Sequence, residues 1–163
     1  MQHGHVLAGL GEGALGGGIG TAVMSGVMLA ARRTGLMSQQ PPEAITEAAL
    51  DATGIQERDE KTLDILASVL HFGFGISVGG IFGMMHRSVR VHPVLGGIAF
   101  ATLVWATSYQ GWVPALGIMP PASRDEPGRP ITMLLAHWVY GATLGAIISW
   151  CDSRTNSNSD GEA

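Results

Sequence analysis

Hydrophobic residues fall into four long runs that contain no Asp, Glu, Lys or Arg. The runs lie between residues 12 and 32, 64 and 87, 90 and 124, and 129 and 152. A helix rises about 1.5 Å per residue, so about 20 residues cross the roughly 30 Å hydrocarbon core of a bilayer. The pattern therefore predicts membrane-spanning helices at about 6–31, 65–85, 93–113 and 131–150 within one membrane domain, residues 1–151. The last residues, 152–163, are polar and predict a flexible tail.

Composition supports this interpretation. Only 13% of the 163 residues are charged, compared with roughly 25% in typical soluble domains. This excludes an ordinary soluble enzyme. The formal net charge of −4 provides no basic excess, so nucleic acid is an unsuitable partner and the lipid bilayer is the expected one.

A short helix is predicted in the long connection between the first two spans. Pro41 and Pro42 suit the first helical turn, and Gly54 suits the end, so we expect a helix over about 42–53. Apolar and acidic side chains occupy different faces of it, so it either lies on the membrane surface or is an ordinary solvated helix. The apolar face holds Ile45, Ala48, Ala49 and Ala52, and the acidic face holds Glu43, Glu47 and Asp51.

Glycines recur four residues apart inside the predicted spans. In lipid, a missing side chain lets two helix backbones approach closely, and GxxxG spacing is typical of such contacts. The pattern therefore predicts a tightly packed bundle of helices. The packing residues of the second and fourth spans are Gly75, Gly79, Gly83, Gly141 and Gly145.

The two halves of the chain are similar to each other. The segment from His71 to Gly79 matches that from His137 to Gly145: histidine, aromatic, any residue, aromatic, glycine, then hydroxyl and glycine at the same places. At one common offset, Gly17 aligns with Gly96 and the double proline at 41 with that at 120. The sequence thus predicts an all-α, polytopic four-helix bundle made of two tandem two-helix repeats. Because each repeat crosses twice, the pseudo-two-fold axis should follow the membrane normal.

Parallel second and fourth spans would bring two histidines to similar depth. We expect His71 and His137 to form a polar layer with Ser108 and Tyr109 from the third span. Three roles are open to the histidine pair: hydrogen bonds between helices, passage of protons or a solute, or axial ligation of haem b. The first is favoured, because the glycines share the histidine faces and leave little room for a porphyrin. The sequence accordingly predicts no cofactor, with haem b as an alternative.

A second group of polar residues is expected on the opposite side of the membrane. Glu12, His86 and His92 fall there, but none stands at a recognised metal-ligand spacing. No metal site is predicted. No phosphate loop, nucleophile elbow or HExxH motif occurs in the sequence. An accessory or scaffold component without its own catalytic activity is therefore the favoured function, and a small proton or solute pathway protein or a haem-binding redox subunit are the alternatives.

The chain resembles the YagU-like family of bacterial inner-membrane proteins, whose function is uncharacterised. The resemblance rests on Pro41-Pro42 with Ile45-Thr46-Glu47, on His71-Phe72-Gly73-Phe74-Gly75, and on the segments around Trp105, Ser108-Tyr109, Gly111-Trp112, Pro120-Pro121 and Ala136-His137. It implies a multi-pass protein of the inner membrane. Other membrane subunits or a second copy of the chain are the protein partners we expect.

The distribution of Lys and Arg predicts the orientation. The first and third connections hold six basic residues, compared with three at the opposite side. The positive-inside rule then places these connections in the cytoplasm and both termini outside. The six are Arg32, Arg33, Arg58, Lys61, Arg124 and Arg129, and the three are Arg87, Arg90 and Arg154.

Overall fold

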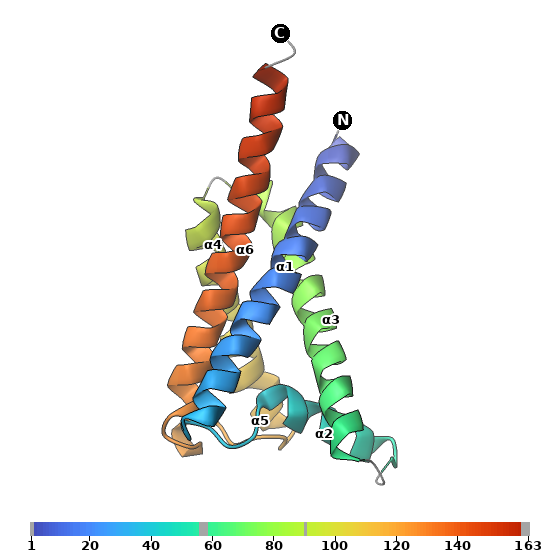
Figure 1. Ribbon diagram of the computed structural model, residues 1–163, viewed down its shortest axis with the longest axis vertical. Helices are drawn as coiled ribbons and strands as arrows, with labels where there is room; N and C mark the ends of the chain where they lie inside the picture. The colour runs from blue at the N-terminus through green and yellow to red at the C-terminus, as the bar shows by residue number, and fades with distance from the viewer. Residues whose placement is uncertain (1, 56–58, 90, 161–163) are drawn as a thin grey trace.

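The computed structural model describes residues 2–55, 59–89 and 91–160, with side chains for 6–55, 59–89 and 91–154. This part of the chain is helical and contains no strand (Figure 1), which confirms the predicted all-α class. The elements are α1 (Gln2–Arg33), α2 (Pro41–Ala52), α3 (Glu60–His86), α4 (Pro93–Thr107), the π-helical turn η1 (Ser108–Trp112), α5 (Val113–Ala115), the 3-10 turn η2 (Ala122–Arg124) and α6 (Arg129–Asp160).

Local sequence signals explain where several helices begin and end. Pro41 and Pro93 stand at the first positions of α2 and α4, where the missing N–H costs nothing. Asp59 caps α3, since its carboxylate accepts the backbone N–H of Thr62 at 2.8 Å. Gly35 and Gly54 follow α1 and α2 with φ of 76° and 80°, a left-handed conformation that glycine adopts without strain.

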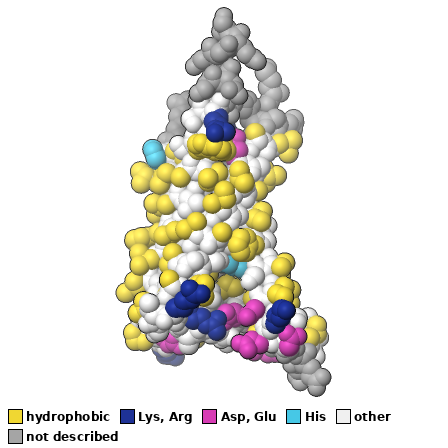
Figure 2. Space-filling view, in the orientation of Figure 1, with side chains coloured by type: hydrophobic (Ala, Val, Ile, Leu, Met, Phe, Trp, Pro, Cys, Tyr) yellow, Lys and Arg dark blue, Asp and Glu magenta, His cyan; other side chains and the backbone are white. Residues whose placement is uncertain are grey.

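Three helices of the described chain are long and apolar enough to cross a membrane. They are Val6–Arg33, Glu60–His86 and Arg129–Arg154, which cover the first, second and fourth predicted spans. Figure 2 shows apolar side chains around the middle of the visible face, and charged side chains gathered toward its two ends. Leu7, Val69 and Ile131 are each more than half exposed, as lipid-facing side chains would be.

The third predicted span differs from a regular helix. The α-helix α4 ends at Thr107, and the chain continues through the π-turn η1 into α5. The backbone N–H of Val113 bonds to the carbonyl of Ser108, five residues back. Pro114 explains the change, because a proline has no N–H to donate and its ring crowds the carbonyl four residues earlier. The widened turn relieves that contact and keeps the path helical to Ala115.

The end of the chain also differs from the expected tail. Helix α6 continues to Asp160, so residues 152–160 of the predicted flexible segment are helical. No proline or glycine interrupts this stretch, and the helix therefore has no local reason to end at Cys151. Residues 161–163 lie outside the described part.

Helix α1 lies between α3 and α6, and α4 packs on the other side of α6 (Figure 1). The backbones of paired helices are in direct contact at glycines. A Cβ atom built on Gly79 would lie 2.7 Å from the Cα of Gly17, and one built on Gly145 would lie 2.5 Å from the Cα of Val94. Atoms this close leave no space for any side chain, so α1 with α3 and α4 with α6 form two tight antiparallel pairs.

Helices α3 and α4 make little contact, although only a short connection that begins with the turn at Arg87 and Ser88 separates them. They diverge from that turn toward the opposite end, where α2 packs against α3 (Figure 1).

Candidate functional site

A cavity of about 320 Å³ lies where α3 and α4 diverge. Its walls come from α1, α3, α4, η1, α5 and α6, and α2 closes the end with Pro41 and Pro42. The lining is largely apolar, and four aromatic side chains contribute to it: Phe74, Tyr109, Trp112 and Tyr140. The π-turn η1 supplies three lining residues, so the irregular helix forms part of the cavity wall.

The four residues expected to form one polar layer all line this cavity: His71, Ser108, Tyr109 and His137. The hydroxyl groups, however, are bonded elsewhere. Ser108 donates to the carbonyl of Val104 at 2.6 Å, and Tyr109 donates to the carboxylate of Asp125. The histidines therefore share a cavity with Ser108 and Tyr109 but no hydrogen bond with them.

His137 is held in one orientation by its own helix. The imidazole is buried, with 8% exposed, and its Nδ1–H donates to the backbone carbonyl of Met133 at 2.7 Å. A carbonyl oxygen can only accept, so Nδ1 carries the proton in the neutral ring. Nε2, the nitrogen farther from the α6 backbone, is then left as an acceptor.

His71 stands between two cavities of different character. A second cavity, also of about 320 Å³, lies between α1, α2 and α3 and includes Arg32, Glu43 and Asp64 in its lining. His71 lines this polar cavity as well as the apolar one. Its Nε2 is buried and has no hydrogen-bond partner among the described residues, which costs on the order of 1–3 kcal/mol.

Tyr140 is a cavity residue that sequence reasoning did not select. Its hydroxyl donates to the carbonyl of Gly75 at 2.7 Å and so ties α6 to α3. The internal similarity contained a signal, because Tyr140 aligns with Phe74. Tyrosine adds a hydroxyl group where the first repeat has phenylalanine, and a buried tyrosine hydroxyl usually has a hydrogen-bond partner.

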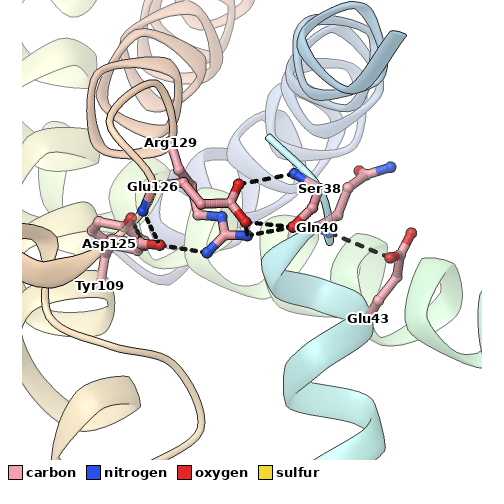
Figure 3. Close-up of polar contacts among 7 residues, drawn as sticks. All are labelled: Ser38, Gln40, Glu43, Tyr109, Asp125, Glu126 and Arg129. Atoms are coloured by element: carbon pink, nitrogen blue, oxygen red, sulfur yellow. Dashed lines mark hydrogen bonds and ion pairs between the residues drawn. The ribbon is translucent and has the colours of Figure 1, made fainter. Parts of the chain in front are cut away.

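A network of polar side chains closes the α2 end of the molecule (Figure 3). Arg129 at the start of α6 pairs with Asp125, and their side chains are only 6% and 1% exposed. Arg129 also donates to the hydroxyl of Ser38 at 3.1 Å and pairs with Glu126 at 3.1 Å. We call Ser38, Tyr109, Asp125, Glu126 and Arg129 the loop clamp, because they join the α1–α2 connection to η1 and to the start of α6.

Glu126 completes the loop clamp through Ser38. Its carboxylate accepts from the Ser38 hydroxyl at 2.6 Å and from the Ser38 backbone N–H at 3.0 Å. These two bonds lower the pKa of Glu126 below its ordinary value of 4.5, and the bond from the Ser38 hydroxyl has the larger effect. Because folding lowers this pKa, the stabilisation is full above the unfolded value and is lost as the pH falls through the folded value.

The opposite end carries the second predicted polar group. Glu12 pairs with Arg87, which also reaches Asp152 at 3.2 Å. His86 stacks on Phe82 with ring centres 5.5 Å apart. His92 is exposed and precedes α4, where its backbone carbonyl accepts the N–H of Gly96 at 2.9 Å but its side chain makes no capping bond. Glu12 thus has a basic partner that sequence reasoning did not assign. Within the described residues, no group of three or more His, Cys, Asp or Glu is arranged to hold a metal ion.

Fold and site define an all-helical protein with three helices able to cross a membrane and a mainly apolar cavity between its helix pairs. The chain matches the family model described as "Family of unknown function (DUF6789)" over residues 7–159, and it belongs to that family. No curated protein and no solved structure matches it. The family match does not bear on the YagU-like resemblance, which stays a prediction.

Proposed function

We propose that this chain is a multi-pass protein of the inner membrane that serves as an accessory component, without catalysis of its own, by binding an apolar molecule between its two helix pairs. The observation that carries the proposal is the cavity of about 320 Å³ beside the divergence of α3 and α4. Ligand cavities in proteins are mostly apolar with a few placed polar groups and occupy about 300–1,000 Å³. This cavity has that character, and π-turns such as η1 are frequent at functional sites.

A four-helix membrane bundle is part of the proposal. The segment from Pro93 to Ala115 is helical throughout, although its type changes at η1. It is therefore long enough to cross the hydrocarbon core alongside the three longer helices. Its packing against α6 supports this arrangement, since α6 is itself one of the helices able to span.

Tandem repetition is supported by the contacts at the glycines. Built Cβ atoms on Gly17 and Gly97 would both collide with a glycine carbonyl, that of Gly75 in the first pair and that of Gly141 in the second. Gly79 and Gly145 likewise meet the carbonyls of Gly13 and Pro93. Residues 13 and 93 are separated by the same number of residues as 17 and 97. This offset is one residue larger than the offset that aligns Gly17 with Gly96 in the sequence. The two pairs therefore pack in the same register.

The alternative functions fit the geometry less well. A pathway across the membrane would have to continue past the cavity, where α1 and α3 are in backbone contact from Gly75 to Gly83. Axial ligation of haem b would need the Nε2 atoms of both histidines at one iron, whereas Nε2 of His71 is covered by other protein atoms that an iron would have to displace. His71 lines both cavities, and this position favours a proton pathway as the second candidate function.

Filling the cavity should abolish binding of an apolar probe. Val104 lines the cavity, and its neighbour Leu103 is 59% exposed on the outer face of α4. We expect purified protein in detergent to bind anthracene saturably at one molecule per chain, measured by energy transfer from tryptophan. Val104→Phe should weaken binding about tenfold or more because its ring occupies the site, while Leu103→Phe should leave it unchanged. Equal binding by both variants would remove the proposal.

Orientation can be tested from the tail. The count of basic residues places both termini outside the cell, although Arg58 and Arg90 of that count lie outside the described residues. In a chain with Cys151→Ser and Ser157→Cys, a membrane-impermeant maleimide should label intact cells. A tail that reacts only after the cells are lysed would reverse the orientation and place the loop clamp outside.

A further inference from the structure

The polar groups that line the apolar cavity are nearly all acceptors. Five lining side chains carry a hydroxyl, and each hydroxyl already donates its proton within the protein. The acceptors are the carbonyls of Gly17, Pro42, Val104 and Gly75 for Thr21, Thr46, Ser108 and Tyr140, and the Asp125 carboxylate for Tyr109. The indole of Trp112 belongs to a residue that is 41% exposed, at the outer part of the lining. An occupant therefore meets few donors.

His137 provides the best-defined acceptor. Its Nδ1–H is used by the carbonyl of Met133, so Nε2 of the neutral ring carries a lone pair and no proton. The ring is buried and belongs to the cavity wall. A molecule that fills the cavity removes water from this nitrogen. If the molecule offers no donor in its place, the binding free energy becomes less favourable, because a buried acceptor is left without a hydrogen bond. An occupant that donates a hydrogen bond avoids this loss.

Charge narrows the class of occupant further. Among the described residues, no Lys, Arg, Asp or Glu lines this cavity, whereas Arg32, Glu43 and Asp64 line the separate polar cavity. Burying an unpaired carboxylate or ammonium in apolar surroundings is strongly unfavourable. Acids and amines in their charged forms are therefore poor occupants. A neutral molecule with an apolar body and one donating group matches the lining.

We propose that the cavity selects neutral apolar alcohols or phenols, and that Nε2 of His137 accepts the hydrogen bond from their hydroxyl group. This inference rests on the proposed binding function and specifies the chemistry of the ligand. The aromatic side chains around the cavity suit a flat hydrocarbon body. His71 lines the same cavity, but no hydrogen bond among the described residues fixes which of its nitrogens carries the proton, and its Nε2 is buried without a partner.

Three probes of nearly equal size test the inference: anthracene, 2-hydroxyanthracene and 2-methoxyanthracene. The methoxy compound has an oxygen but no proton to donate. The full-length protein in detergent should bind 2-hydroxyanthracene about fivefold or more tightly than the other two, the gain expected of one buried hydrogen bond. Binding is measured by saturable energy transfer from tryptophan.

Variants locate the acceptor. His137→Phe should bind all three probes equally, whereas His137→Gln, which carries an amide oxygen near the position of Nε2, should retain part of the preference. His71→Phe is the matched control and should keep the full preference. Equal binding of the three probes by the natural chain would overturn the inference but leave the proposed function standing, and absence of saturable binding by every probe would overturn both. A preference that survives in His137→Phe would show the acceptor to be elsewhere.

Discussion

Replacing Gly79 with leucine is expected to unfold the protein in detergent or to lower its free energy of unfolding by about 3 kcal/mol or more. The first side-chain carbon alone would lie 2.7 Å from the Cα and 3.0 Å from the backbone nitrogen of Gly17. Both obstacles are main-chain atoms of a long helix, so no side-chain rotation can relieve the collision. Separation of α1 from α3 is the only response, and it would open a direct backbone contact of the first helix pair.

Gly73, on the same helix, provides the matched control. A Cβ atom there would meet nothing within 4 Å, so Gly73→Leu should leave the melting temperature nearly unchanged. Gly145→Leu should be as damaging as Gly79→Leu, since its Cβ atom would lie 2.5 Å from the Cα of Val94. Thermal unfolding followed by circular dichroism, together with size-exclusion chromatography, measures all three. Unchanged stability of both Gly79→Leu and Gly145→Leu would show that the backbones do not touch.

Removing the charge of Arg129 should also be severely destabilising. Arg129→Met leaves the carboxylate of Asp125, which is 1% exposed, with two hydrogen bonds among the described residues, from the Tyr109 hydroxyl and from the backbone N–H of Glu126. Breaking one side of a buried ion pair typically costs about 3–5 kcal/mol, because the remaining charge is buried and uncompensated. The α1–α2 connection should loosen as well, since Ser38 loses the guanidinium that it accepts from.

Two further variants separate charge pairing from a general effect of substitution. Arg124→Met removes an exposed basic residue of η2, in the connection that leads into α6. This substitution should change the free energy of unfolding by no more than about 0.5 kcal/mol. Adding Asp125→Leu to Arg129→Met removes both buried charges and should recover part of the loss, although the Tyr109 hydroxyl then needs a new partner. Unfolding is followed by the same thermal measurement. If Arg129→Met were as stable as Arg124→Met, the loop clamp would have no role in holding the connections together.

The candidate site was only partly predictable from sequence. Placing His71 and His137 in one layer needed just the spacing of the spans and their parallel direction, and both line one cavity. The direction in which the Tyr109 hydroxyl points could not be predicted, because its acceptor Asp125 belongs to an irregular loop. The loop clamp could not be predicted either, because Ser38 and Arg129 are in contact although they are 91 residues apart in the chain. Chain separation of this size leaves no periodic signal.

The sequence by itself determined the helical class, the three long apolar helices and the position of α2. These depend on local quantities: hydropathy over about 20 residues, and the backbone restrictions of proline and glycine. Only the tertiary structure decided that α3 and α4 diverge, that η1 widens ahead of Pro114, and that a cavity remains beside α2. A cavity is the space that packed helices fail to fill, so it depends on the angles between helices rather than on any one of them. Which nitrogen of His137 is free to accept followed only from the bond to Met133.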